Sequence, residues 1–430
     1  MRNKILKHCR ICFSKKLIGY LDLGKQPFSN SFLNYKDLKK EKKFPLIIVL
    51  CKNCGLSQLS IIPNVKFIFS KYDYLSSSSK ALSNHYKELV ETLLKNYNIL
   101  STDTVLDIGC NDGILLKHYP KNFNNVIGIE PSDASKHIKQ KRIKLINKFF
   151  SYKTSNEYLK KYAKPKIITI TNVLAQINNL NEFAKGLYNI LNKESLIVIE
   201  FPYLLDMINK GLFDLIYHEH LSYFALTPLK FLFRKFGIKI INFEKLDLGA
   251  SGPAIRLFLA KNDSPYQTSN KVIKQIKYEK VWGAQKIKQY EFFKKIVNAK
   301  IDKIKKIIYL KYNQGYKLGC FTASSKGNTL LNCLNLEKKI IKFASENNKK
   351  KIGKYTPGTH IKIISDKDFL KEKIDYAILL SWNYKKFFLS KSLSSLTNSL
   401  AVFFCKSIDV VLIITAVSVR ALRSLSSIIF

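Results

Sequence analysis

A glycine-containing turn between a strand and a helix constrains this chain more than any other feature. The run Val105-Leu-Asp-Ile-Gly-Cys-Asn-Asp-Gly113 places an apolar strand directly before a tight turn with two glycines. Glycine lets the backbone approach a ligand closely at a position where a side chain would block it. A second apolar strand ends at Glu130, whose carboxylate can accept both hydroxyls of a ribose. We therefore expect a strand–turn–helix unit that binds a ribose-containing cofactor.

The residues of this turn also distinguish between cofactors. The G-x-N-x-G pattern of residues 109–113 differs from the G-x-G-x-x-G pattern that accommodates the pyrophosphate of a dinucleotide. Asp107 precedes the turn, and its negative charge disfavours a phosphate and favours a cationic ligand. These residues indicate a sulfonium cofactor, and the alternative is a turn that binds no ligand.

Apolar strands alternate with helical stretches between about residues 103 and 245. The strands are expected at 105–109, 125–130, 166–170 and 195–199. Such alternation is typical of a parallel sheet with helices on both faces, so the expected fold class is α/β. A lysine-rich helical stretch follows at about 270–310. A second α/β unit begins at Tyr316, with strands expected at 339–343, 360–365 and 376–380.

Four of the eight cysteines form two C-x-x-C pairs, Cys9 with Cys12 and Cys51 with Cys54. Two such pairs supply four thiolates, which suits a tetrahedral zinc ion, and Gly55 allows the turn that brings the second pair onto the ion. The 38 residues between the pairs exceed the loops of the shortest zinc ribbons, but a longer loop costs little more. We expect a structural zinc site, because no coordination position stays open. The remaining scattered cysteines indicate a reducing compartment.

A dense group of acid/base side chains follows the strand at 195–199. The segment Tyr217-His-Glu-His-Leu-Ser-Tyr223 holds two histidines, a glutamate and two tyrosines. Histidine titrates near neutral pH and a neighbouring carboxylate can orient it, so the group suits proton transfer. A single histidine at this place would more often be an ordinary surface or core residue. The density of such side chains favours a catalytic role.

In these motifs the chain resembles the class I SAM-dependent methyltransferases, and more closely the sugar C-methyltransferases that act on nucleotide-linked 4-keto-deoxyhexoses. The resemblance covers about residues 8–385. It implies a four-cysteine zinc domain (1–66), a Rossmann-like methyltransferase domain that binds S-adenosyl-L-methionine (67–245) and a C-terminal α/β substrate domain (246–430). The cofactor residues that it implies are Asp107, Gly109, Asn111, Gly113 and Glu130.

The resemblance also implies roles in catalysis. Tyr217, Glu219 and His220 would line the sugar pocket, and His220 would act as the base. Tyr74, or alternatively Tyr72, would point at the sugar. A ketone acidifies the proton on the neighbouring carbon, so His220 would remove that proton and the enolate carbon would attack the sulfonium methyl group. The expected activity is C-methylation of a nucleotide-linked keto-deoxysugar.

Further matches to this family lie in the C-terminal half. They comprise 323–331 and 355–360, which in the family contribute to the nucleotide-sugar side of the cleft, and the linking segment 249–253 followed by Arg256. The family often has a histidine after its third sheet strand, where this chain has Gln176. We expect this difference to bear on substrate choice.

The stretch 388–430 differs in composition from the rest of the chain. It is rich in serine, contains few lysines and does not resemble the closing strand of the family. Two expectations follow: a helical tail that packs on the body, or a C-terminus read from a shifted frame. Resequencing the coding region would decide whether the frame is unbroken.

The formal net charge of +42 raises the alternative of a nucleic-acid partner. A nucleic-acid-binding protein concentrates its basic residues, whereas lysine is spread here over almost the whole chain. We therefore expect a small-molecule substrate and no nucleic acid. The alternatives are O- or N-methylation of another small molecule, an RNA-binding zinc protein or RNA methyltransferase, and an inactive scaffold. With no apolar run of membrane-spanning length free of charges, and no signal-peptide core at its start, the chain is expected in the cytoplasm.

Overall fold

The computed structural model describes residues 4–64, 75–249, 252–384, 400–404 and 411–415. Internal contacts divide the chain into two units. The first unit comprises Met1–Leu21, Ile47–Lys210 and Glu219–Glu291, and the second comprises Asp22–Leu46, Gly211–His218 and Phe292–Phe430. In the part of the chain that the structure describes, no helix combines the length and the apolar character needed to cross a bilayer.

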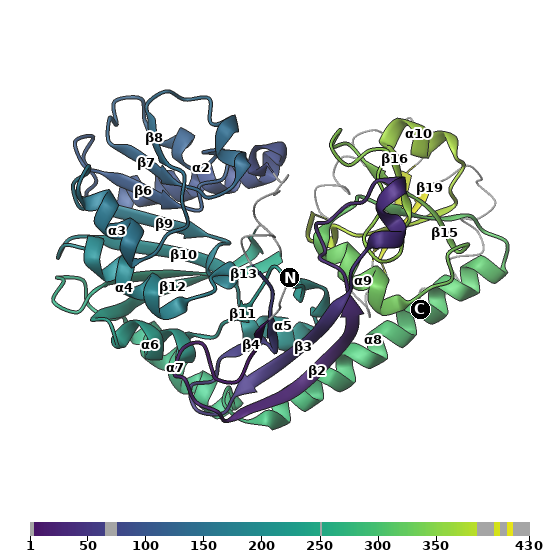
Figure 1. The fold of residues 1–430 in the computed structure, drawn as a ribbon, viewed down its shortest axis with the longest axis horizontal. Coiled ribbons are helices and arrows are strands. Elements are labelled where there is room, and N and C mark those ends of the chain that lie inside the picture. Colours follow the sequence, from purple (N-terminus) through teal and green to yellow (C-terminus); the bar gives the residue numbers. More distant parts are fainter. Residues whose placement is uncertain (1–3, 65–74, 250–251, 385–399, 405–410, 416–430) are drawn as a thin grey trace. The chain divides into compact units, whose positions relative to one another are not determined.

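A seven-stranded sheet forms the centre of the first unit, with the strand order β12-β13-β10-β9-β6-β7-β8 (Figure 1). Its strands are β6 (Val105–Ile108), β7 (Val126–Ile129), β8 (Ile143–Ile146), β9 (Ile167–Thr171), β10 (Leu196–Pro202), β12 (Ile238–Gly249) and β13 (Gly252–Lys261). The five strands β6 to β10 are parallel, whereas β13 lies antiparallel between β10 and β12. The expected α/β sheet is confirmed. Residues that follow β6, β7, β9 and β10 therefore meet at one carboxyl edge.

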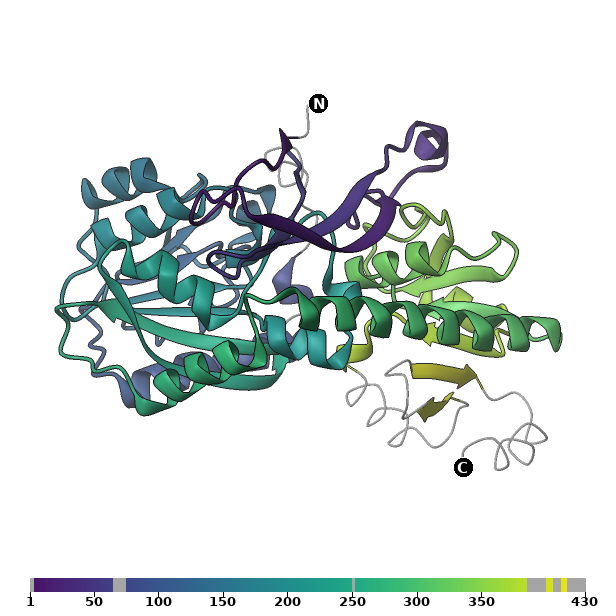
Figure 2. The ribbon, with the colours of Figure 1, turned by 90° about the horizontal axis from the view of Figure 1, so that it is seen from below.

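Helices connect the strands of the first unit. They are α2 (Lys80–Asn96), α3 (Tyr152–Leu159), α4 (Leu180–Ile190), α5 (Leu204–Lys210), α6 (Leu226–Arg234) and α7 (Asn270–Trp282). The long helix α8 (Ile287–Asn313) begins in this unit and continues without a break into the residues of the second (Figure 2). Together α7 and α8 cover the lysine-rich stretch that the sequence predicts to be helical.

Helix α2 packs its apolar face on the sheet. Leu82, Leu89 and Leu93 belong to the same buried cluster as Val105 of β6. Helix α2 begins at Lys80, where the side chain of Ser79 accepts the N–H of Leu82 and caps the first turn.

A smaller sheet with the strand order β11-β4-β3-β2 includes residues of the N-terminal segment. Its strands are β2 (Leu17–Gln26), β3 (Phe44–Cys51), β4 (Ser57–Leu59) and β11 (Ser222–Tyr223), and β1 (Lys4–Ile5) pairs separately with β5 (Ile61–Ile62). The strand β11 follows the predicted acid/base residues directly. It pairs antiparallel with β4, with Ser222 opposite Gln58 and Tyr223 opposite Ser57.

The second unit contains a six-stranded sheet with the order β16-β15-β14-β17-β19-β18. Its elements are β14 (Leu318–Phe321), α9 (Ser325–Leu334), β15 (Ile341–Glu346), β16 (Lys362–Ser365), α10 (Asp366–Lys371), β17 (Tyr376–Leu379), β18 (Leu400–Phe404) and β19 (Val411–Thr415). The strands β14 to β17 are parallel, as the sequence predicts for an α/β unit. The expected helical tail does not hold for 400–404 and 411–415, since both segments are strands: β19 pairs antiparallel with β17, and β18 pairs antiparallel with β19.

Candidate functional site

The cofactor turn follows β6 at the carboxyl edge of the sheet. Its backbone is left-handed at alternate positions, with φ of 78° at Gly109, 50° at Asn111 and 76° at Gly113. A β carbon on Gly109 would lie 2.2 Å from Cγ2 of Val173, far inside contact distance. Both the backbone conformation and the neighbouring side chain therefore require glycine at position 109.

Glu130 follows β7 and faces the same turn. One carboxylate oxygen accepts the backbone N–H of Asn111 at 2.9 Å, and the other accepts that of Ser132 at 2.8 Å. The side chain is buried, so these two bonds fix the carboxylate in place. Each oxygen has a second lone pair, and Glu130 therefore suits the role of accepting ribose hydroxyls. The structure brings together Asn111 and Glu130, as the sequence predicts.

Asp107, in β6, is a further acidic residue next to the cofactor turn. Its carboxyl group is buried and accepts the hydroxyl of Thr169 at 2.7 Å. Burial raises the pKa of Asp107 to about 7, and the charge of Glu130 acts in the same direction. A cation close to this carboxyl group would favour its ionised form. The residue chemistry thus fits a positively charged sulfonium cofactor better than it fits a phosphate.

The turn also contacts the segment that leads into α2. The side chain of Asn111 accepts the backbone N–H of Ser76 at 2.8 Å, and the side chain of Asp112 accepts that of Ser77 at 3.1 Å. Asp112 is absent from the residues that we predicted, although its place inside the turn was a usable signal. Tyr74, the fourth predicted catalytic residue, lies outside the described residues.

The predicted acid/base residues are deeply buried. Glu219 is 2% exposed and His220 is 5% exposed, and both belong to the first unit. The ring of Tyr223 lies 6.5 Å from that of His220, centroid to centroid, in an edge-on arrangement. Buried titratable side chains outside a regular element are a common feature of sites that transfer protons.

Backbone hydrogen bonds hold this segment at the carboxyl edge of the large sheet. The N–H of Leu221 donates to the carbonyl of Ala175, in the loop after β9, at 2.8 Å. The carbonyl of Phe224 accepts the N–H of Leu204, directly after β10, at 2.9 Å. The acid/base segment and the cofactor turn are thus attached to strand ends at the same edge of one sheet.

Tyr217 and His218, the first two residues of the acid/base segment 217–223, belong to the second unit. Tyr217 is buried there. His218 packs edge-on against the rings of Phe28 and Phe44, and its Nε2 lies 3.2 Å from the carbonyl oxygen of Pro45. Burial lowers the pKa of His218, which favours the uncharged form of its ring. His218 is therefore held by packing against these two aromatic rings.

A buried ionic network at the end of β10 was not predicted from the sequence. Glu200 is fully buried, and its carboxylate binds Nε2 of His85 at 2.8 Å and Nε of Arg256 at 2.6 Å. Arg256 also contacts Glu244 at 3.0 Å. Burial alone would raise the pKa of Glu200, but His85 and Arg256 hold this pKa below its ordinary value. The ionised network joins α2, β10, β12 and β13 at the carboxyl edge.

We expect Arg256→Met to lower the free energy of unfolding by about 3–5 kcal/mol at pH 7, because it leaves a buried carboxylate with one partner fewer. Urea denaturation followed by fluorescence measures the change. The stabilisation from a carboxylate of lowered pKa exists above its unfolded pKa of about 4.3 and is lost as the pH falls through its folded pKa. Lys245→Met, which removes the longer and more exposed ion pair with Asp206, is the control and should cost less than about 1 kcal/mol. Equal effects of the two substitutions would contradict this account.

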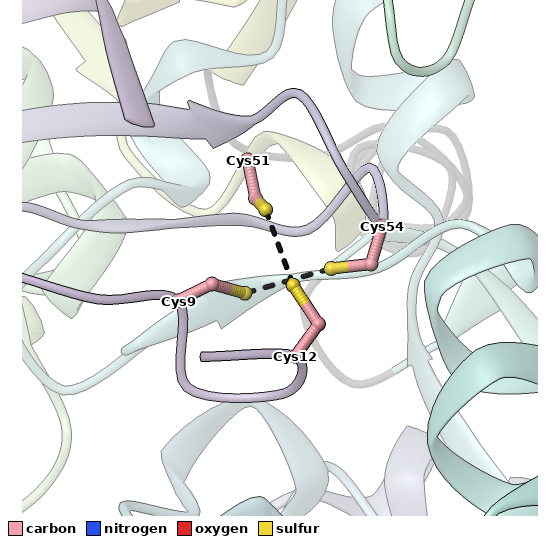
Figure 3. A group of neighbouring side chains, drawn as sticks. All are labelled: Cys9, Cys12, Cys51 and Cys54. Carbon is pink, nitrogen blue, oxygen red and sulfur yellow. Dashed lines mark hydrogen bonds between the residues drawn. The ribbon is translucent and has the colours of Figure 1, made fainter. Parts of the chain in front are cut away.

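The four paired cysteines converge on one point (Figure 3). Their four sulfur atoms all lie within 4.8 Å of one another, and Cys9–Cys54 and Cys12–Cys51 are each 3.5 Å apart. Zn–S bonds of about 2.3 Å in a tetrahedron separate the sulfurs by about 3.8 Å. The donor set and its spacing therefore fit a zinc ion with no open position, as a structural role requires.

Cys54→Ser should abolish stoichiometric zinc binding and lower the Tm by about 5 °C or more, because metal binding contributes to folding. Plasma emission spectrometry and thermal unfolding of the purified protein measure these two quantities. Cys333→Ser, which changes a thiol outside the cluster, should keep both values. A Cys54→Ser protein that retains one zinc per chain would rule out this ligand set.

Three family models match the chain in succession. They describe a zinc binding domain at residues 9–69, a methyltransferase domain at 79–242 and a C-methyltransferase C-terminal domain at 250–403. The C-methyltransferase NovU of Streptomyces niveus is 25% identical over 381 residues, which are 88% of this chain and 90% of that protein.

Solved structures resemble part of the chain. A SAM-dependent methyltransferase from Thermotoga maritima is 15% identical and matches 46% of this chain and all of that chain, with a TM-score of 0.34. The magnesium protoporphyrin IX methyltransferase of Synechocystis is 12% identical and matches 42% and 82%, with a TM-score of 0.32. From the three models, the relative and the cysteine cluster, the chain is a member of the SAM-dependent C-methyltransferases, with S-adenosylmethionine as its cofactor and a zinc-binding domain at its N-terminal end.

Proposed function

We propose that this enzyme methylates a carbon atom of a nucleotide-linked keto-deoxysugar through an enolate. The observation that carries the proposal is the buried pair Glu219 and His220 in a segment bonded to the ends of β9 and β10. The cofactor turn after β6 lies at the same edge of the sheet, so a base there is on the side of the methyl donor. The relative from Streptomyces niveus is a C-methyltransferase, which supports the choice of carbon as the acceptor.

The proposed chemistry begins with proton removal. A carbonyl acidifies the C–H bond next to it, so His220 takes this proton and the C–H electron pair enters the enolate. Glu219 and Tyr217 orient the base or polarise the carbonyl, which limits the charge that develops on oxygen. Bound S-adenosylmethionine supplies an electrophilic methyl group, and the new C–C bond forms as the S–CH₃ bond breaks.

A buried cation in the second unit suits a phosphate group. Lys326, at the start of α9, is buried, and burial lowers its pKa to about 7 although the charge of Asp214 opposes this effect. Its ammonium group lies 4.4 Å from the centre of the Trp382 ring and contacts the side chain of Asn383. The indole N–H donates to Asp214 at 2.5 Å. A phosphate would favour the charged form of Lys326, which supports a phosphorylated substrate.

The test is incubation of the zinc-loaded enzyme with S-adenosylmethionine and matched pairs of nucleotide sugars in D₂O. Each pair contains a 4-keto-deoxysugar and the same sugar with a 4-hydroxyl group. NMR and mass spectrometry follow deuterium incorporation next to the carbonyl and the mass gain of a methyl group. The proposal expects both signals with the keto sugar alone and a new C–CH₃ resonance in the product.

Other results would replace this proposal. Methylation of the 4-hydroxy sugar with a new O–CH₃ resonance would establish O-methylation. Absence of deuterium incorporation and of methylation across the keto-sugar pairs would exclude this substrate class. RNA binding with a steep dependence on salt would instead support an RNA substrate.

The proposal includes a reducing, cytoplasmic setting. The seven cysteines with described side chains, Cys9, Cys12, Cys51, Cys54, Cys110, Cys320 and Cys333, form no disulfide among themselves. A four-thiolate zinc site needs its sulfurs reduced. Fractionation of the native cells with an antibody to the protein tests this setting.

A further inference from the structure

Arg10 lies inside the first zinc knuckle, between Cys9 and Cys12. Its Nη1 donates to the carbonyl oxygens of Ile177 at 2.8 Å and Asn178 at 3.1 Å. Its Nη2 donates to the carbonyl oxygen of Leu221 at 2.6 Å and to the hydroxyl of Ser222. One guanidinium group therefore binds two segments that are more than forty residues apart in sequence.

Both segments belong to the edge of the sheet that carries the proposed chemistry. Ile177 and Asn178 lie in the loop that follows β9, and Leu221 and Ser222 come directly after His220. Outside regular elements, backbone carbonyls need partners from side chains or water. A charged, planar donor with five N–H groups can satisfy several of them at once and fix their relative geometry.

The knuckle that holds Arg10 is itself fixed. The side-chain amide of Asn181, at the start of α4, donates to the carbonyls of Arg10 at 2.9 Å and Ile11 at 3.2 Å. The backbone N–H of Arg10 donates to the side chain of Gln58 at 3.2 Å, and Gln58 lies opposite Ser222 in the β4–β11 pair. The zinc ligands on either side of Arg10 restrain the same turn. The backbone that carries the guanidinium group is therefore held in place.

We infer that Arg10 is a positioning residue for the reaction: it transmits the rigidity of the zinc knuckle to the segment that holds Glu219 and His220. This inference rests on the proposed function for the identity of the base. The hydrogen bonds between Arg10 and this segment are independent of the proposed function, because they fix only the position of the segment. The zinc site would then serve catalysis through geometry, at a distance from the reacting atoms.

The second knuckle provides a matched control. Lys52 occupies the position in Cys51–Cys54 that Arg10 occupies in Cys9–Cys12, and Lys52 is exposed. Lys52→Gln therefore removes a cation from the equivalent place in a zinc knuckle without touching the acid/base segment. Arg10→Gln removes the fork of donors, and Arg10→Lys keeps a positive charge but lacks the planar fork.

The experiment compares the zinc-loaded wild type with these three variants. Zinc content is measured first, followed by S-adenosylhomocysteine binding by calorimetry. Hydrogen–deuterium exchange with mass spectrometry then reports the protection of the peptide that contains Leu221–Tyr223, with an α2 peptide as internal reference. Turnover is measured with the keto-sugar nucleotide that the preceding test identifies.

Arg10→Gln should keep its zinc and bind S-adenosylhomocysteine within about twofold of wild type, while the Leu221–Tyr223 peptide exchanges about tenfold faster or more. Its kcat should fall by about tenfold or more, because misplacement of a catalytic group costs rate. Arg10→Lys should lie between Arg10→Gln and wild type, and Lys52→Gln should match wild type in every measurement.

Unchanged exchange in zinc-loaded Arg10→Gln would overturn the inference, whatever happens to kcat. If Arg10→Gln loses zinc, Arg10→Lys decides, and wild-type exchange in that variant overturns the inference as well. Failure of the keto-sugar substrate would leave the exchange result standing, so the two proposals fail separately.

Discussion

His220→Asn should reduce methyl transfer by about 100-fold to 10,000-fold and leave cofactor binding intact. Asparagine keeps a hydrogen-bonding side chain but cannot take a proton at neutral pH, so the contribution of a general base is lost. Steady-state turnover with the keto-sugar nucleotide measures the first effect. Calorimetric titration with S-adenosylhomocysteine measures the second.

His137→Asn is the control, because His137 is an exposed histidine of the same unit. It should retain full turnover. Loss of deuterium incorporation by the substrate in His220→Asn would identify proton removal as the affected step. Near-normal turnover in this variant would show that another residue is the base, and the mechanism would have to be rebuilt around it.

Gly109→Arg should abolish detectable binding of S-adenosylhomocysteine, with the Kd raised by about 100-fold or more. The β carbon alone would overlap Cγ2 of Val173, and the backbone at 109 is in the left-handed region that side chains disfavour. The turn would have to move away from the position in which Glu130 meets Asn111. Calorimetric titration of the folded, zinc-loaded protein measures the change.

Gly24→Ala separates backbone strain from the clash. Gly24 has a φ of 77°, almost the same as that of Gly109, but a β carbon there meets nothing within 4 Å. It should cost about 1–2 kcal/mol of stability at most and leave cofactor binding unchanged. If Gly109→Arg binds S-adenosylhomocysteine with the affinity of the wild type, the turn at 109–113 is not part of the cofactor site.

The sequence predicted those parts of the site that depend on local order along the chain. The turn at 109–113 needs only neighbouring residues, and a C-x-x-C pair brings two sulfurs close by itself. Strand positions in the second unit were correct to within a few residues, because β-branched runs between polar turns are local signals.

The buried network around Glu200 could not be predicted in this way. Glu200 occupies a run that reads as an apolar strand, and its partners His85 and Arg256 are 115 and 56 residues away in sequence. The pair with Arg256 arises only from the register of β10 against β13, in which these two residues stand opposite each other. A pattern of single residues carries no information on such register.

The roles of the two histidines in the acid/base segment also needed the structure. His218 and His220 have equal claims by residue type, and the family resemblance alone favoured the second. The contacts of His218 with Phe28, Phe44 and Pro45 identify it as a packing residue, which no local pattern around it indicates.

The pairing of β11 with β4 bears on the order in which the protein folds during its synthesis. β4 lies between β3 and β11, so until Ser222 and Tyr223 have been synthesised one side of β4 has no neighbouring strand. An uncovered strand edge invites pairing with other chains. A fragment that ends near residue 66 would keep that edge open permanently, and we expect it to bind zinc yet self-associate. The nascent chain passes through the same exposed state for more than 150 residues of synthesis.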